Sequence, residues 1–130
     1  MGSFLSPLLD RPTGSWILRN VRTGRAVATT IEPAFDSESR RRGLLGRDGI
    51  DAGAALIIAP CSSIHMFFMR FAIDVVFADR SGRVVKACRN VRPWRIAIAR
   101  GAFAAVELPV GAIELSETRP GDQLEVSAGA

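Results

Sequence analysis

The chain has 130 residues, a formal net charge of +4 and 48% hydrophobic residues, which is typical of one folded domain and not of a disordered chain. Its longest unbroken apolar run, Ala54–Ala59, stops at Pro60 and is far shorter than the roughly 18–20 residues that span a membrane. These features predict a single soluble domain, and the positive charge indicates only a weak attraction to anions.

The chain is predicted to consist of a flexible N-terminal arm at residues 1–14 and a single β domain at residues 15–130. No internal repeat or low-complexity linker divides it further. The arm resembles a signal peptide only faintly, because it lacks a basic stretch and Ser6, Pro7 and Asp10 interrupt its apolar residues. We therefore expect a cytoplasmic protein, while a secretory leader removed from the chain stays an open alternative.

The first predicted elements are a β-hairpin and one short helix. Strands at residues 16–18 and 26–31 flank a glycine turn, and Pro33 is expected to end the second strand. Asp36 can cap the start of a helix and Gly46 can end it, which predicts a short helix between them.

From residue 55 onward the pattern is β. Short apolar runs bounded by glycine, proline or turn residues predict strands. The runs lie at residues 55–58, 64–69, 73–78, 84–85, 96–98, 103–108 and 123–127. Pro109 and Gly111 predict a short irregular or helical piece before the last strand. One clear helix is too few for parallel β–α–β crossovers, so the sequence predicts a mainly β fold, an antiparallel sandwich or barrel with one short helix.

Several motifs occur in the order seen in one known family. They are RGLLGR at residues 42–47, IHMFFMR at 64–70, IDVVF at 73–77, GRVV at 82–85, VELPVG at 106–111 and PGD at 120–122. With these motifs the chain resembles the domain of unknown function 192 family of bacteria and archaea. The resemblance implies a compact, jelly-roll-like β fold and no established activity.

A candidate ligand site centres on the only histidine, His65, and on two carboxylates in apolar strands. Asp74 and Glu107 each interrupt an apolar run, and a buried carboxylate needs a partner or a cleft. If residues 70–72 close a hairpin, the strands of His65 and Asp74 are neighbours and their side chains can meet. Glu107 joins them only if the strand at 103–108 lies alongside. The predicted ligand-binding residues are His65, Met69, Arg70, Asp74 and Glu107, with Met69 and Phe67 as the apolar wall and Arg70 at the mouth.

This site predicts a non-catalytic domain that binds a small polar ligand. A hydrolase that uses Asp74 and Glu107 as general acid and base is the alternative. Purely structural roles also stay open, with His65 bonded to a backbone carbonyl and Asp74 bracing a turn. No nucleophile-elbow motif accompanies these residues, so whether the chain is an enzyme stays open, and we lean against it.

The two cysteines, Cys61 and Cys88, lack a CxxC spacing and are predicted to be unbridged thiols. Cys61, His65, Met66 and Met69 are soft donors of the kind that Cu(I) prefers. In an extended strand, however, Met66 points away from His65 and Met69. We therefore predict no metal site and no cofactor.

A basic segment near the middle of the chain is the remaining candidate. Residues 80–106 contain no acid, and Trp94 lies among their cations, a mixture that single-stranded nucleic acid favours. The cations are Arg80, Arg83, Lys86, Arg89, Arg92, Arg95 and Arg100. Their spacing of three alternates between the faces of a strand, and no nucleic-acid motif accompanies them. We predict a solvated edge without specific nucleic-acid binding, and a weak nucleic-acid-binding module is the third alternative. The oligomeric state stays open.

Overall fold

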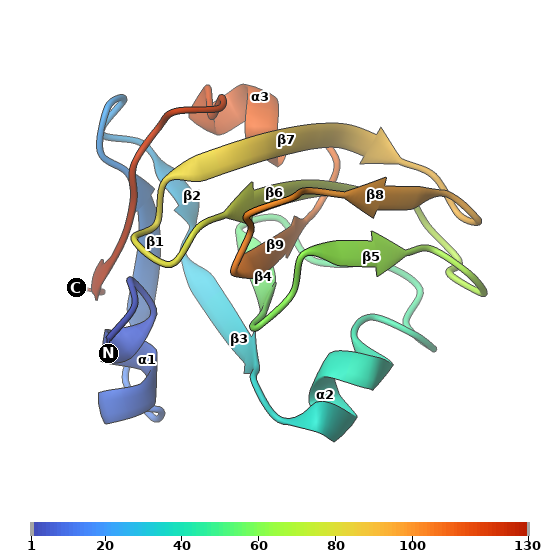
Figure 1. Cartoon of the computed structure of the whole chain (residues 1–130), viewed down its shortest axis with the longest axis horizontal. Coiled ribbons are helices and arrows are strands. Elements are labelled where there is room, and N and C mark those ends of the chain that lie inside the picture. Colours follow the sequence, from blue (N-terminus) through green and yellow to red (C-terminus); the bar gives the residue numbers. More distant parts are fainter. Residues whose placement is uncertain (1, 130) are drawn as a thin grey trace.

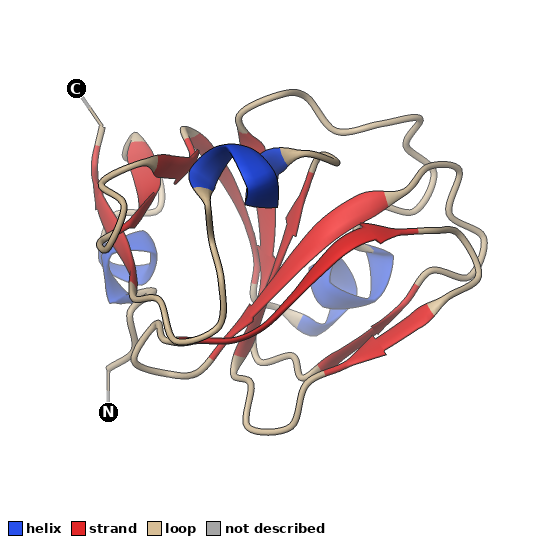
Figure 2. Ribbon diagram, turned by 90° about the horizontal axis from the view of Figure 1, so that it is seen from above, coloured by secondary structure: helices blue, strands red, loops and turns tan. Residues whose placement is uncertain are grey.

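The computed structural model describes residues 2–129, which form three β-sheets and three short helices (Figure 1). The three-stranded sheet has the order β10 (Leu124–Ala128), β1 (Trp16–Asn20) and β2 (Ala26–Ala28). The five-stranded sheet has the order β3 (Thr30–Ala34), β4 (Ala54–Ile58), β9 (Ala104–Leu108), β6 (Ile73–Ala78) and β7 (Val84–Val91). The third sheet pairs β5 (Ser63–His65) with β8 (Ile96–Ile98). The helices are α1 (Ser6–Asp10), α2 (Ser37–Arg42) and α3 (Ala112–Ser116), separated from one another by strands (Figure 2).

The predicted mainly β, mostly antiparallel fold is confirmed, because only β3 and β4 pair in parallel. The prediction of a single helix is wrong, since α1 and α3 are also present among the described residues. The strands of residues 2–129 form three separate sheets and not the closed barrel that was one predicted alternative. The jelly-roll arrangement stays a prediction. No helix within this range is both long and apolar enough to cross a bilayer.

The three central strands of the five-stranded sheet, β4, β9 and β6, are buried on both faces, and side-chain alternation divides their residues between two cores. One face carries Ile57 and Val76, which pack with Leu18 of β1 and Leu124 of β10. The other face carries Leu56, Val75 and Phe77, which pack with residues after α2 and with β5 and β8. Because β4, β6 and β9 are covered on both sides, a polar side chain on any of them is enclosed by the core of its own face.

The described part of the predicted N-terminal arm, residues 2–14, carries α1. Leu5 and Leu8, spaced one helical turn apart, are almost completely buried in the core beside the three-stranded sheet. The backbone N–H of Phe4 also donates to the carbonyl of Arg80 (2.9 Å). The apolar spacing of Leu5 and Leu8 is the sequence signal that indicates this packing.

Helix α2 begins where the sequence predicts and ends earlier. The Asp36 carboxylate accepts a hydrogen bond from the backbone N–H of Ser39 (2.8 Å), as an N-cap does. The helix ends at Gly43, whose φ of +48° favours glycine, and not at Gly46. Pro33 was expected to end a strand but lies inside β3. This is compatible with its missing N–H because β3 is an edge strand.

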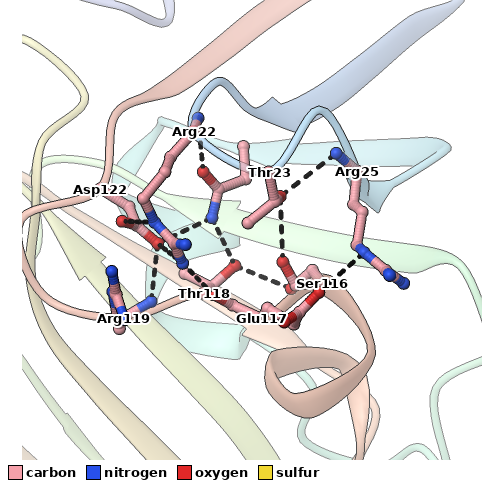
Figure 3. Close-up of polar contacts among 9 residues, drawn as sticks. Arg22, Thr23, Arg25, Ser116, Glu117, Thr118, Arg119 and Asp122 are labelled. Atoms are coloured by element: carbon pink, nitrogen blue, oxygen red, sulfur yellow. Dashed lines mark hydrogen bonds and ion pairs between the residues drawn. The ribbon is translucent and has the colours of Figure 1, made fainter.

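A buried polar network joins the β1–β2 hairpin to the loop before β10 (Figure 3). Asp122 accepts hydrogen bonds from Arg22 Nε (2.6 Å), Asn20 Nδ2 (2.9 Å) and the backbone N–H of Arg119 (2.9 Å). The hydrogen bond from Arg22, more than any other contact, lowers the pKa of Asp122 to about 2. Thr118 accepts a further bond from Asn20 (3.3 Å). These contacts satisfy buried polar groups that would otherwise destabilise the fold, so we assign the network a structural role.

Candidate functional site

A cavity of about 190 Å³ lies on the second face of the five-stranded sheet and is lined by residues from the C-terminal end of α2 and from strand β5. Glu107 of β9 is the one acidic residue among its described lining residues. The other lining residues are Arg40, Arg41, Arg42, Gly43, Leu44, Leu45, Ile58, Cys61, Ser63, Ile64, His65, Met66 and Met69. The wall is mixed, with aliphatic side chains toward the core and cations contributed by α2.

Glu107 is the most unusual residue of this cavity. It lies opposite Leu56 of β4 on one side and Val75 of β6 on the other, so aliphatic side chains flank it. Only 6% of Glu107 is exposed. Burial raises the pKa of its carboxyl to about 7, and the charge of Arg47 opposes that rise. Within residues 2–129 no hydrogen bond or ion pair holds the carboxyl group.

Arg47 and Gly43 lie near Glu107 on the side of α2, and neither forms a hydrogen bond or an ion pair with its carboxyl group. Arg47 donates two hydrogen bonds to Glu32 (3.0 and 2.7 Å), so its guanidinium is engaged elsewhere. Gly43 comes so close that a Cβ at this position would lie 3.8 Å from Glu107 Oε1. The polypeptide at the end of α2 therefore passes directly beside the carboxyl group, which opens toward the cavity.

Two polar side chains around the cavity, those of Cys61 and Arg40, have partners of their own. The Cys61 thiol donates to the carbonyl of Ser63 (3.1 Å), and burial raises its pKa. Cys61 and Cys88 are both free, which confirms the prediction of unbridged thiols. Arg40 donates to the carbonyl of Asp36 (3.3 Å) and to that of Pro60 (3.5 Å). The thiol is thus a poor nucleophile, because it is both desolvated and protonated near neutral pH.

The cavity brings together three of the five predicted ligand-binding residues, His65, Met69 and Glu107. Arg70 lies outside it, with its guanidinium bonded to Asp48 (2.9 Å) and to the carbonyl of Gly46 (3.4 Å). Arg70 is therefore not one of the residues that line this cavity. Whether His65, Met69 and Glu107 bind a ligand stays a prediction.

The predicted hairpin that joins the strands of His65 and Asp74 is also wrong. Strand β5 ends at His65 and pairs with β8, whereas the strand of Asp74 pairs with β7 and β9. After His65, Met66 still exchanges backbone hydrogen bonds with Arg95 and Trp94 (both 2.8 Å), and the chain then turns, with the N–H of Met69 donating to the carbonyl of Met66 (3.3 Å). This turn ends the strand that the sequence predicts over residues 64–69.

Asp74 is structural. It is 1% exposed and lies on the first face of the sheet, directly opposite Leu108. Its carboxylate accepts three backbone hydrogen bonds, from Asn90 (2.9 Å), Gly111 (3.0 Å) and Ile113 (3.0 Å). Because Glu107 faces the opposite side of the same sheet, Asp74 and Glu107 do not form a pair of general acid and base. The geometry contradicts the carboxylate-pair hydrolase.

The sequence interpretation missed the contribution of α2. Three consecutive arginines followed by a glycine, Arg40 to Gly43, are the signal that could have indicated it. A helix that ends in cations and a permissive residue can bring positive charge close to a facing strand. Among the described residues, no group of three or more histidine, cysteine or acidic side chains is arranged to hold a metal ion.

A family model and curated relatives show that the chain belongs to a family described as uncharacterised, and a solved structure shares its fold. The model of the family described as "Uncharacterized ACR" (DUF192) matches residues 19–126. A UPF0127 protein of Thermococcus sibiricus is 35% identical over 115 residues, covering 84% of this chain and 73% of its own. A UPF0127 protein of Pyrococcus furiosus is 42% identical over 112 residues, which cover 82% of this chain and 94% of the Pyrococcus protein. The crystal structure of a protein of unknown function from Novosphingobium aromaticivorans superposes with a TM-score of 0.73 at 22% identity. The match covers 85% of this chain and 83% of that protein.

Proposed function

The chain belongs to the DUF192 family, and from its cavity we propose that it is a non-catalytic domain that binds a small polar ligand at Glu107. The observation that carries the proposal is the state of that carboxyl group. It is buried and has no hydrogen-bond partner among residues 2–129, and it opens into a cavity. No fully enclosed side-chain oxygen or nitrogen of residues 2–129 lacks a partner, so the Glu107 carboxyl oxygens retain surface that faces the cavity, where a polar ligand group can form hydrogen bonds with them.

The pKa of about 7 gives Glu107 two hydrogen-bonding modes near neutral pH. The protonated carboxyl can donate one hydrogen bond, and the carboxylate can only accept. A ligand hydroxyl, amide or amine group could therefore be matched by one form or the other. Arg41 and Arg42, both exposed at the cavity, favour a ligand whose far end is anionic or rich in acceptor oxygens.

The size of the cavity limits the ligand further. At about 190 Å³ it is smaller than the roughly 300–1,000 Å³ of pockets that hold drug-sized molecules. Leu44, Ile58 and Met66 supply an apolar wall. We therefore propose a molecule of metabolite size with one short apolar portion between two polar ends.

A thermal-shift panel of small hydroxy acids, amino acids, amides and sugars tests this proposal. We expect at least one compound to raise the melting temperature of the wild type by several degrees, because about 100 times Kd of ligand adds about 2.7 kcal/mol. Glu107→Gln should lose that rise, because the amide can neither carry the negative charge of the carboxylate nor offer the O–H donor of the protonated carboxyl.

Glu125→Gln is the matched control, because it removes the same charge from an exposed position on β10. It should retain the full ligand-induced rise. If no compound stabilises the wild type, or if both variants respond as the wild type does, the binding site at Glu107 is rejected.

A further inference from the structure

Four aromatic rings form a row on the surface beside β5 and β8. His65 stacks on Phe67 with ring centroids 4.7 Å apart, and Phe67 lies 5.9 Å from Trp94. Trp94 in turn lies 4.9 Å from Phe68. Phe68 is 75% exposed and Trp94 is 59% exposed, so the row presents ring surface to solvent instead of filling a core.

The backbone holds the two outermost rings in an unfavourable conformation. Phe68 has a φ of +65° and Trp94 a φ of +73°, in the left-handed region that bulky residues rarely adopt. Such strain persists where the surrounding structure enforces it, and it gathers at functional sites. Here the backbone bonds of Met66 to Trp94 and Arg95 enforce it. The chain keeps these two rings in solvent at an energetic cost.

The ring row continues into the outward face of the small sheet. His65 lies opposite Ile96, and Ser63 lies opposite Ile98. Ile96 and Ile98 are 58% and 57% exposed. We call Phe67, Phe68 and Trp94 together with Ile96 and Ile98 the β5–β8 platform.

Cations flank the β5–β8 platform on two sides. Lys86 donates from its Nζ to the carbonyl of Ile98 (2.8 Å), which fixes one positive charge at the far end. Arg92 and Arg95 are exposed on either side of Trp94, and Arg100 is exposed after Ile98. Residues 80–106 contain no acid that could neutralise them. On the β5 side, α2 contributes further arginines at the cavity that Ser63 and His65 also line.

We propose that the β5–β8 platform binds single-stranded nucleic acid without sequence preference. Successive bases can stack on exposed rings, since every base has a flat face, and the flanking arginines can contact phosphates. The inference goes beyond the small-ligand site and does not depend on it. It also agrees with the expectation of no specific nucleic-acid binding, because no motif for reading base edges accompanies the platform.

Charge complementarity favours this occupant over a second copy of the chain. Two copies that meet through this face would bring the same cations against each other, and like charges across an interface are repulsive. A row of rings at 4.7–5.9 Å spacing also favours flat, stackable partners over acyl chains. Dimerisation and binding to lipid are therefore outcomes that the experiment must separate from binding to nucleic acid.

The test is fluorescence anisotropy of a labelled oligothymidylate of about 15 nucleotides, which spans one site of the usual size. We expect binding at low salt that weakens steeply between about 50 and 200 mM salt. Phe68→Gly and Trp94→Gly remove the rings while suiting the positive φ angles, so both variants should fold. Each should bind about tenfold more weakly. Leu115→Ala, which trims an equally exposed side chain on α3, should bind as the wild type does.

Arg95→Gln measures the phosphate contacts. It should lower the slope of binding against salt by about one, and Arg11→Gln, an exposed arginine in the segment after α1, should not. The proposal is overturned if the oligonucleotide does not bind at low salt, or if it binds equally well to both ring variants. It is also overturned if the ring variants reduce only dimerisation in sedimentation, or only binding to vesicles of anionic phospholipid.

Discussion

Asp74→Ala is expected to lower the free energy of unfolding by about 3 kcal/mol or more, because three backbone N–H groups would lose their acceptor together. Those groups belong to Asn90, Gly111 and Ile113, and the last bond is fully buried. They join the β7 strand to the start of α3, so the loss should loosen both elements. Urea denaturation followed by circular dichroism measures the effect.

Asp74→Asn should be milder than Asp74→Ala, since the amide retains one acceptor oxygen. Asp48→Ala is the control, because it removes a carboxylate that is 90% exposed and pairs only with Arg70 at the surface. It should change stability by less than about 0.5 kcal/mol. A loss below about 1 kcal/mol in Asp74→Ala would contradict the bracing role.

Glu107→Gln is expected to make the protein more stable than the wild type above neutral pH. The pKa of Glu107 is raised from 4.5 to about 7 in the folded state, so the folded state holds its proton more tightly than the unfolded chain. The stability contributed by that proton is fully present below pH 4.5 and is lost as pH rises through about 7. The pKa shift corresponds to a loss of about 3 kcal/mol in the free energy of unfolding of the wild type. The glutamine variant does not undergo this loss.

The comparison requires unfolding free energies of wild type and Glu107→Gln across pH 4 to 9, a range that begins below the ordinary pKa of 4.5 and ends above the raised pKa of about 7. Asp122 does not interfere, because its pKa is lowered and its contribution is lost only as pH falls toward about 2. Glu125→Gln again serves as the exposed control and should follow the wild-type curve. Parallel curves for wild type and Glu107→Gln would show that burial does not perturb this carboxyl.

Much of the β architecture could be predicted because local patterns determine it. The apolar strand β6 and the Asp36 N-cap both lie where the sequence indicates them. The strand that begins at Val84 runs on to Val91, although most of its residues are polar or small. It is extended because it pairs along its length with β6, a non-local interaction that periodicity does not reveal.

The candidate site shows why strand register limits such predictions. Asp74 and Glu107 both interrupt apolar strands, and β6 and β9 are indeed neighbours. Val75, however, and not Asp74, lies opposite Glu107. A shift of one residue would place both carboxyls on the same face, because successive side chains point to opposite sides. The sequence therefore indicates two enclosed carboxyls but not that the sheet separates them.

The pairing of β5 with β8 was equally beyond local patterns. The run from Ile64 to Met69 is as apolar as a strand, yet it turns after Met66, whose backbone is bonded to Trp94 and Arg95. Two aromatic residues at positive φ could not be foreseen, because sequence preference opposes that conformation. The contacts that enforce it come from a segment almost thirty residues away.

A titration of the Glu107 carboxyl group is the most direct test of the ligand site. The carboxyl carbon of Glu107, followed by NMR through a pH titration, should show a midpoint near 7 in the free protein. Adding the compound that stabilises the wild type should move this midpoint, because a ligand bonded to the carboxyl changes the balance of its two forms. A midpoint near the ordinary 4.5, unmoved by every compound of the panel, would contradict a ligand site at Glu107.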